Sequence, residues 1–554
     1  MDNLRLIYVI TLVFLGMLIW EAWQDDYVRT DPMAKQQQTA VNVAAEAAGQ
    51  KDVPIASVDT GTATAVPNIA EASAEPSSKI IEIETDVFKV QIDTRGGTLV
   101  GADLLKYSKS TDEKDKTFIL LNSHSSNLFL IQSGLIGADK ENAPTHKSIF
   151  QSEKTSYRLE DGKDELIVPL VWTSPSGVQV GKIFTFRRGE YQIKLKHKVV
   201  NGSNETWAGR DYRQLVRGEP TVSTGESAFI VTYTGGAYYT PENKFSKIDF
   251  EEIAEKIELE VTGGWTAMLQ HYFFAGIIPP AEETQNFYSK KLGGQNRYIL
   301  GSYGQALKAE PGQSVEFNGS LWVGPKLQEQ IEKIAPGLEL TVDYGFLTII
   351  AKPLFWLLDF INQAVGNWGW SIIFLTILIK LAFYRLSAAS YRSMAGMKKL
   401  GPKLQAMKEK YGDDKERLNR AMMELYKTEK INPVGGCLPI LVQIPVFIAL
   451  YWVLLESVEM RDAPWMLWID NLSAKDPYFI LPLLMGASMF IQQKLNPAPP
   501  DPMQAKIMMS LPFIFTAMFA FFPAGLVLYW VVNNILSIAQ QWRITKVMEQ
   551  EGKH

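Results

Sequence analysis

The 554-residue sequence has little of the chemistry from which disulfide scaffolds and metal sites are built. Its single cysteine, Cys437, excludes an internal disulfide and a cysteine-based metal cluster. Its five histidines are too scattered for metal-ligand spacing such as HxxxH. Lysine and arginine number 55 against 60 aspartates and glutamates, a balance that gives no general case for nucleic-acid binding. We therefore expect no metal, no cofactor and no direct nucleic-acid partner.

Motifs of common enzymes are also missing. The sequence contains no GxxxxGK[ST] phosphate loop, no GxSxG nucleophile elbow and no HExxH metal helix. Arg210, Asp211 and His271 could form a carbohydrate site, but ordinary polar residues of a β domain are the simpler interpretation. We expect that the protein is not an enzyme.

Long apolar segments are present, although the mean hydropathy of −0.04 conceals them. The first is Leu6–Trp20, which approaches the length of a membrane span. Bulky and polar residues follow it, where a cleaved signal peptide would have small ones. Residues 1–24 are therefore predicted to be an uncleaved signal-anchor span. Arg5 precedes the span and acidic residues follow it, which places the N-terminus in the cytoplasm.

The next two segments differ sharply in composition. Residues 25–79 contain no Leu, Phe or Trp, and so cannot bury enough apolar surface to offset the entropy of ordering. We expect a disordered external linker there. Residues 80–340 alternate apolar and polar positions, as in Phe88–Ile92, and carry repeated turn signals such as Asn201-Gly202. This pattern predicts a large external all-β domain, a sandwich.

After Leu340 the chain becomes strongly apolar. The predicted helix at 341–365 carries Lys352, Pro353 and Asp359, which favours a helix lying in the membrane interface. A core of five spans is predicted over 366–543, followed by a tail at 544–554. The spans are expected at about 367–385, 435–455, 477–493, 507–522 and 525–542, and the third and fourth of these are short for an average bilayer. The predicted fold class is thus a polytopic α-helical membrane protein of six spans with an external β-sandwich.

Loop charges give an independent test of the topology. Residues 386–430 hold eleven basic and six acidic residues, whereas residues 456–477 hold two basic and five acidic ones. The positive-inside rule places the first loop in the cytoplasm and the second outside. Six spans threaded from a cytoplasmic N-terminus reproduce both assignments and place the C-terminus in the cytoplasm.

Polar residues inside the spans are the candidate functional residues. Lys380 lies among apolar neighbours, and Thr376 precedes it by one helical turn on the same face. Snorkelling of Lys380 toward the cytoplasmic end is the competing interpretation. Other spans also carry polar residues, which favours a wet cavity over isolated interhelical hydrogen bonds; these are Gln443, Gln492, Gln493, Asn533 and Asn534.

The basic loop at 386–432 is predicted to be a cytoplasmic helical hairpin, because its apolar residues follow helical spacing on both sides of Gly412. Its methionines could offer an adaptable surface that captures apolar substrates, or they could form the seam between the two helices. The residues concerned are Met394, Met397, Met407 and Met422.

Residues 430–451, KINPVGGCLPILVQIPVFIALY, closely resemble the signature of the YidC/Oxa1/Alb3 family of membrane-protein insertases. Residues 522–530, FPAGLVLYW, resemble the turn between the family's last two spans, and the lysine-rich hairpin resembles its first cytoplasmic loop. The anchor, linker and external β domain resemble the form of the family found in Gram-negative bacteria. The resemblance covers essentially the whole chain.

This resemblance implies a hydrophilic groove that is open to the cytoplasm and to lipid. The groove's positive charge maps onto Lys380, where bacterial relatives usually carry arginine; a compact ammonium lacks the planar fork of that group. Trp530 stands where a close relative has tyrosine. The residues that the resemblance assigns to the groove are Lys380, Thr376, Gln443, Tyr529, Trp530 and Asn533.

The resemblance further implies that the protein inserts and folds inner-membrane proteins, alone or with the Sec translocon. The expected partners are nascent inner-membrane proteins, Sec translocon subunits, membrane lipids and, with less support from the short tail, ribosomes or targeting factors. The expected location is the bacterial inner membrane, with the β domain in the periplasm. The alternatives are a solute channel or transporter, which would normally show internal repeats, and a membrane-tethered sugar-binding domain.

Overall fold

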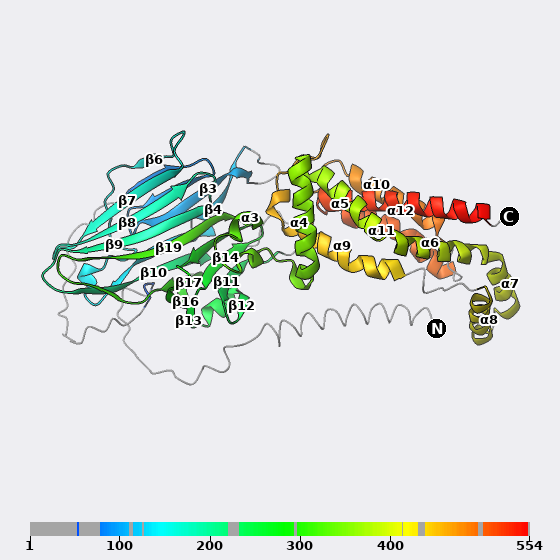
Figure 1. The fold of residues 1–554 in the computed structure, drawn as a ribbon, viewed down its shortest axis with the longest axis horizontal. Coiled ribbons are helices and arrows are strands. Elements are labelled where there is room, and N and C mark those ends of the chain that lie inside the picture. Colours follow the sequence, from blue (N-terminus) through cyan, green and yellow to red (C-terminus); the bar gives the residue numbers. More distant parts are fainter. Residues whose placement is uncertain are drawn as a thin grey trace. The chain divides into compact units, whose positions relative to one another are not determined.

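The computed structural model describes residues 52–54, 78–109, 113, 115–124, 127–219, 232–292, 296–412, 414–429, 438–496 and 502–551. The chain divides into two compact units, with the division after Val342. We call them the β unit and the helical unit (Figure 1). The predicted signal anchor and the first eight residues of the predicted signature, 430–437, lie outside the described residues.

The described strands of the β unit form two sheets. The first has eleven strands, in the order β13 (Glu258–Thr262), β16 (Thr284–Leu292), β17 (Arg297–Tyr303), β10 (Trp207–Gly218), β5 (Phe129–Gly137), β4 (Thr117–Asn122), β3 (Thr98–Ser108), β2 (Phe88–Asp93), β1 (Ile80–Glu84) and β6 (Ser156–Arg158), with β18 (Leu307–Ala309) beside β10. The second has eight, in the order β12 (Lys244–Ile248), β11 (Gly235–Thr240), β14 (Trp265–Gln270), β15 (Phe273–Ile278), β19 (Ser314–Pro325), β9 (Gln192–Asn201), β8 (Val178–Arg187) and β7 (Glu165–Thr173).

The sheets pack face to face through the alternating apolar positions that the sequence displays. In β8 every second residue is buried, and Phe186 lies edge-to-face with Phe88 of β2 at a centroid distance of 5.9 Å. Nearly all neighbouring strands are antiparallel; β1 and β6 are parallel. Two short helices, α2 (Phe250–Ala254) and α3 (Gln328–Ile331), complete the described part of this unit. The predicted external β-sandwich is confirmed.

Besides residues 78 and 79 at its end, three residues in the middle of the predicted linker depart from the expectation of disorder. Asp52, Val53 and Pro54 are described, and Val53 is buried against the β unit. The composition of residues 25–79 predicts too little apolar surface for a folded core, but a single short segment can dock on a surface that already exists. The prediction of a disordered linker is therefore wrong for these three residues.

The helical unit contains the helices that the apolar segments predict. They are α4 (Thr348–Val365), α5 (Trp368–Ala382), α6 (Tyr384–Lys399), α7 (Gly401–Tyr411), α8 (Lys415–Thr428), α9 (Leu438–Glu456), α10 (Ile480–Leu495), α11 (Pro502–Phe519) and α12 (Ala524–Glu551). Five of them, α5 and α9–α12, coincide with the five predicted core spans. Pairs of contacts along the helices show that α5, α10 and α12 run in one direction and α9 and α11 in the other.

By length and composition, one helix among the described residues, Gly345–Val365, could cross a membrane alone. The pair α5 and α6 reaches this threshold only when taken together, and it is bent by 68°. Figure 1 shows α4 running across the direction of α12. Its face with Ile349, Trp356 and Phe360 is exposed. This arrangement suits the predicted interfacial helix, which remains a prediction.

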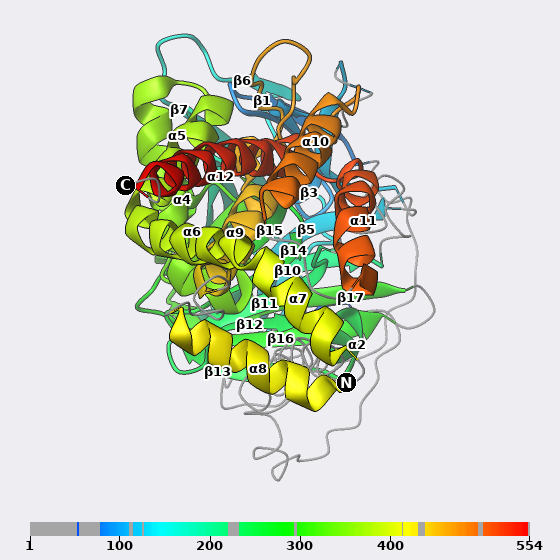
Figure 2. The ribbon, with the colours of Figure 1, turned by 90° about the vertical axis from the view of Figure 1, so that its right-hand side faces the viewer.

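The basic loop contains more helices than a simple hairpin. The helix expected to continue from Met394 to Tyr411 is interrupted between α6, which ends at Lys399, and α7, which begins at Gly401. Pro402 lies in the first turn of α7, where its missing N–H costs nothing, but it cannot continue a helix from α6. The predicted hairpin therefore consists of α7 and α8, which lie side by side (Figure 2).

Candidate functional site

A row of polar side chains follows one buried face of α12. Asn534, Ser537 and Gln541 are spaced by three and four residues, so they share a face of the helix, and each is buried. The helix packs against α5, α6, α9 and α10, and Figure 2 shows it among these neighbours. This row places hydrogen-bonding groups inside the most apolar part of the chain.

Lys380 joins α5 to this row. Its side chain is 8% exposed, and its Nζ donates to Ser537 Oγ at 2.8 Å. The Ser537 hydroxyl in turn donates to the backbone carbonyl of Asn533 at 2.7 Å. Within the part of the chain that the structure describes, Lys380 forms no ion pair. An ammonium group has three donors, so the bond to Ser537 leaves capacity for another acceptor.

Thr376 lies one turn before Lys380, is buried, and donates its hydroxyl to the carbonyl of Ile372 in its own helix at 2.7 Å. This bond satisfies the hydroxyl proton within α5 and leaves the oxygen able to accept a hydrogen bond. The structure therefore brings Thr376, Lys380 and Ser537 together along the contact between α5 and α12.

A second polar group lies between α10 and α12. A pocket of about 190 Å³ is lined by Met489, Gln492, Gln493, Asn496, Trp530 and Asn534. Asn534 donates to Ser488 Oγ at 3.1 Å, and Gln541 donates to Asn496 Oδ1 at 3.1 Å. A pocket of this size and polarity has room and partners for several water molecules. Four of its six residues are polar: Gln492 and Gln493 of α10, Asn496 at the end of α10, and Asn534 of the row on α12.

Tyr529 and Trp530 belong mainly to an aromatic cluster. Phe447 of α9 stacks on Trp530 with a centroid distance of 4.8 Å and on Tyr529 with 6.0 Å. The ring of Trp530 also lies against that of Phe519 in α11, with 4.4 Å between the ring centroids. Trp530 thus has one side in the aromatic cluster and also lines the polar pocket. Gln443 is half-buried one turn before Phe447, on the same side of α9.

The structure therefore brings most of the predicted groove residues to α12 and its neighbours. It also shows four residues that the sequence analysis missed: Ser488, Asn496, Ser537 and Gln541. The polar spacing of three and four residues from Asn534 through Gln541 is the signal that could have found two of them. Ser488 lies in α10 and Asn496 follows its last residue, and the sequence marks the polar face of this helix only by Gln492 and Gln493.

The predicted capture methionines lie on three helices. Met407 of α7 and Met422 of α8 are half-buried in the hairpin, whereas Met394 and Met397 lie on α6. Lys403 and Glu429 form an ion pair that joins the beginning of α7 to the end of α8. Half-burial of Met407 and Met422 fits a hairpin seam. A capture surface for substrates remains a prediction.

The candidate carbohydrate residues have separate surroundings. Asp211 is buried beside Arg213, with 2.7 Å between Oδ2 and NH2, and burial raises the pKa of its carboxyl despite that neighbour. Arg210 lies over the ring of Tyr303, and His271 stacks on Tyr272. Each of the three has a partner in the β unit, as expected for ordinary polar residues of a sandwich.

Comparisons with known proteins cover the whole chain. Residues 80–357 match the model of the YidC periplasmic domain, and residues 360–551 match that of the 60Kd inner membrane protein. The membrane protein insertase YidC of Thioalkalivibrio sulfidiphilus is 52% identical over 565 residues and is matched over 100% of both chains. The corresponding protein of Methylococcus capsulatus is 50% identical over 99% of each chain.

A crystal structure of an active YidC insertase with its first transmembrane domain resolved is 19% identical and covers 84% of this chain and 92% of its own, with a TM-score of 0.39. The identities of the two sequence relatives, over essentially complete chains, decide the family. With a periplasmic β domain followed by helices that carry a buried polar row, the chain belongs to the YidC family of membrane-protein insertases.

Proposed function

We propose that this protein inserts and folds integral proteins of the inner membrane through a hydrophilic groove built around α12. The observation that carries the proposal is the buried polar row of α12, which meets Lys380 of α5 on one side and the pocket beside α10 on the other. Polar and charged groups inside apolar helices are costly, and they normally mark a functional path.

The groove lowers the barrier to translocation. A polar external segment of a substrate has to pass the hydrocarbon layer, where each unsatisfied polar group costs several kcal/mol. Amide and hydroxyl groups of Gln492, Asn534 and Ser537 offer both donors and acceptors to such a segment along part of its path. Lys380 adds a positive charge that attracts acidic residues of the segment. The apolar part of the substrate then moves into lipid and gains about 25 cal/mol for each Å² removed from water.

Short helices contribute to the same effect. Helix α10 has 16 residues, about 24 Å at 1.5 Å per residue, whereas the hydrocarbon core is about 30 Å thick. A short helix thins the adjacent bilayer and thereby shortens the apolar distance that the substrate has to cross. The process needs no nucleotide, because the gain comes from transfer of the apolar segment into lipid.

The topology of the proposal follows the predicted threading. With α5, α10 and α12 running inward, the hairpin of α7 and α8 and the C-terminus lie in the cytoplasm, and the β unit lies in the periplasm. The hairpin then receives substrates from ribosomes or targeting factors, and contacts with Sec translocon subunits and lipids serve larger substrates. The basic charge of the hairpin and the alternating helix directions support this orientation.

Reconstitution tests the proposal against a channel. The purified chain is placed in liposomes without any Sec component, and a single-span protein with a short acidic external segment is synthesised beside them. We expect protease-protected insertion above the level of empty liposomes. Absence of insertion together with leakage of small solutes would support a channel. Deletion of residues 80–335 should leave most of the insertion, whereas a sugar-binding function would be lost entirely.

A further inference from the structure

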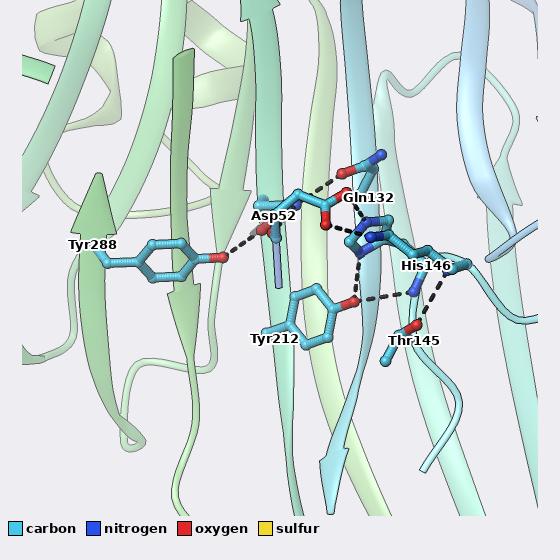
Figure 3. A network of polar contacts seen from close by, with 8 residues as sticks. Asp52, Gln132, Thr145, His146, Tyr212 and Tyr288 are labelled. Atoms are coloured by element: carbon cyan, nitrogen blue, oxygen red, sulfur yellow. Dashed lines mark hydrogen bonds and ion pairs between the residues drawn. The ribbon is translucent and has the colours of Figure 1, made fainter. Parts of the chain in front are cut away.

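The outer face of the eleven-stranded sheet carries a compact polar network (Figure 3). The guanidinium of Arg213 in β10 lies against Gly319 of the other sheet, so it points into the sandwich. Tyr212 and Gln214 are its neighbours in the strand, and they therefore point to the opposite face. Both are completely buried, because other parts of the chain cover this face.

Asp52 of the preceding segment is part of this network. Its carboxylate is 2.9 Å from His146 Nε2 and 2.6 Å from Lys147 Nζ. Its backbone carbonyl accepts a hydrogen bond from Gln214 Nε2 at 3.1 Å. Asp52 is thus held by its side chain and by its main chain, through residues distant in the sequence.

The side chains that bind Asp52 are held in place by other residues of the β unit. The Tyr212 hydroxyl accepts from the backbone N–H of His146 at 3.0 Å and lies 2.7 Å from the ring Nδ1. Its own proton is therefore directed at Nδ1, which leaves the proton of neutral His146 on Nε2, facing Asp52. The imidazole is a donor toward Asp52 whether it is neutral or protonated.

Gln214 is oriented in the same way. The Tyr288 hydroxyl donates to Gln214 Oε1 at 2.6 Å, and Gln132 Oε1 accepts from Gln214 Nε2 at 2.7 Å. The amide is thereby aligned with its Nε2 toward the carbonyl of Asp52. A fully buried glutamine and a buried histidine, each held by a tyrosine, form a binding site that is organised before the segment docks.

We propose that His146, Lys147 and Gln214 form a binding site for the aspartate of a short peptide segment, which is occupied in this chain by Asp52–Pro54. Val53 adds apolar burial beside the polar contacts. Partial burial would raise the pKa of Asp52, but hydrogen bonds from His146 and Lys147 and their charges hold that pKa well below its ordinary value. The site therefore selects the ionised carboxylate.

Docking of Asp52 changes the tether between the predicted anchor and the β unit. Without it, the whole of residues 25–79 would separate the two. With it, only residues 25–51 connect the anchor to the β unit, which roughly halves the maximum reach because reach is proportional to residue number. The site is thus a clip that shortens the stretch of chain between the predicted anchor and the β unit.

Limited trypsin digestion of the full chain in detergent micelles tests the clip. Trypsin cleaves after Lys51, next to the docked aspartate, and after Lys35, which serves as an internal control in the same chain. Rates are measured by mass spectrometry for the wild type, for Lys147→Ala and for His146→Ala. Both variants keep the sequence around the cleaved bond. Lys154→Ala, which removes an exposed lysine from the same part of the chain, is the matched control.

We expect cleavage after Lys51 to become about tenfold faster in Lys147→Ala and faster still in His146→Ala, with cleavage after Lys35 unchanged. In Lys154→Ala both rates should equal those of the wild type. Circular dichroism checks that each variant is folded. If His146→Ala does not fold, the rates of Lys147→Ala alone decide the test. Equal rates after Lys51 in wild type and Lys147→Ala would overturn the proposal. Hydrogen exchange at Val53 that is as fast in the wild type as in Lys147→Ala would overturn it as well.

Discussion

Lys182 of the β unit and Lys380 of the helical unit are both buried, and they differ in what surrounds them. Lys182 of β8 is completely buried, and its Nζ donates to the carbonyls of Gly96 at 2.5 Å and Ser133 at 3.1 Å. The rings of Phe150 and Phe184 lie 5.7 Å from the ammonium. Lys380 of α5 donates to one hydroxyl, that of Ser537 in α12. The same helix also lines the polar pocket.

This difference separates a lysine with a structural role from one that the proposed function places beside the substrate path. Lys182 is held by fixed main-chain acceptors and apolar rings, so no substrate can reach it. Lys380 donates to a single side-chain hydroxyl, and under the proposed function its remaining donors serve a polar substrate segment. Burial alone therefore does not indicate function; the remaining hydrogen-bonding capacity and the neighbouring space do.

The largest expected effect is on stability of the β unit. Lys182→Ala leaves two buried carbonyls without donors and opens a cavity, so the free energy of unfolding should fall by about 3 kcal/mol. Thermal unfolding of the full chain in micelles measures it. Lys196→Ala, which removes a half-exposed ion pair of the neighbouring strand, should cost less than about 1 kcal/mol. Insertion by Lys182→Ala below its unfolding temperature should equal that of the wild type. A clear loss of insertion would contradict a purely structural role for Lys182.

Replacement of Lys380 should lower insertion and leave stability nearly unchanged, the reverse of what is expected for Lys182. Lys380→Glu should lower insertion of substrates with acidic external segments about tenfold, equivalent to about 1.4 kcal/mol, with little change in thermal stability. Lys380→Arg should retain the activity, because the charge is kept. Lys494→Ala of α10, an exposed lysine over Phe490, is the control and should insert normally. Unchanged insertion in Lys380→Glu across several substrates would return this residue to the snorkelling interpretation.

The pH dependence of stability sharpens the comparison further. Burial and the charge of Arg213 lower the pKa of Lys182 well below its ordinary value. The unfolded chain therefore keeps this proton to higher pH than the folded chain, so the contribution of Lys182 to the free energy of unfolding rises with pH between the two pKa values. The slope is at most about 1.4 kcal/mol per pH unit.

Lys182→Met keeps the side-chain volume and removes the titrating group. The difference in unfolding free energy between wild type and Lys182→Met should rise with pH over the interval that ends at the ordinary lysine pKa of 10.5. Denaturant titrations at several pH values measure this difference. A difference that is constant over the whole range would contradict the assigned direction of the pKa shift.

The smallest expected effect concerns the polar pocket beside α10. Asn534→Leu removes the bond to Ser488 and fills part of the pocket with an apolar side chain. Insertion should fall about threefold, since one polar partner of the segment is lost, and the loss should be the same for acidic and neutral substrates. The protease-protection assay with a matched pair of substrates measures it. A loss confined to acidic substrates would show that the pocket acts through Lys380.

Much of this arrangement could be predicted because local patterns decide it. Alternation in Val178–Arg187 predicts a strand and already places Lys182 at an inward position. The positions of α9 to α12 follow from their apolar lengths. The interruption between α6 and α7 was missed because the apolar spacing continues across it, although Pro402 was visible in the sequence.

The site was only partly predictable. Lys380, Gln492 and Asn534 stand out because polar groups are rare in apolar segments. Ser537 and Ser488 do not stand out, since serine is common in helices of every kind, and only the packing of α5 and α10 against α12 gives them their partners.

The sequence by itself determined the two units, their strands and helices, and the family, because periodicity, length and charge act locally along the chain. Tertiary structure decided that fixed main-chain acceptors enclose Lys182, whereas Lys380 has one hydroxyl acceptor and keeps further donors. It also decided that Asp52 docks on His146, Lys147 and Gln214, residues separated from it by long stretches of chain. Such contacts depend on which side chains meet across strands and helices, and that is settled only when the whole chain packs.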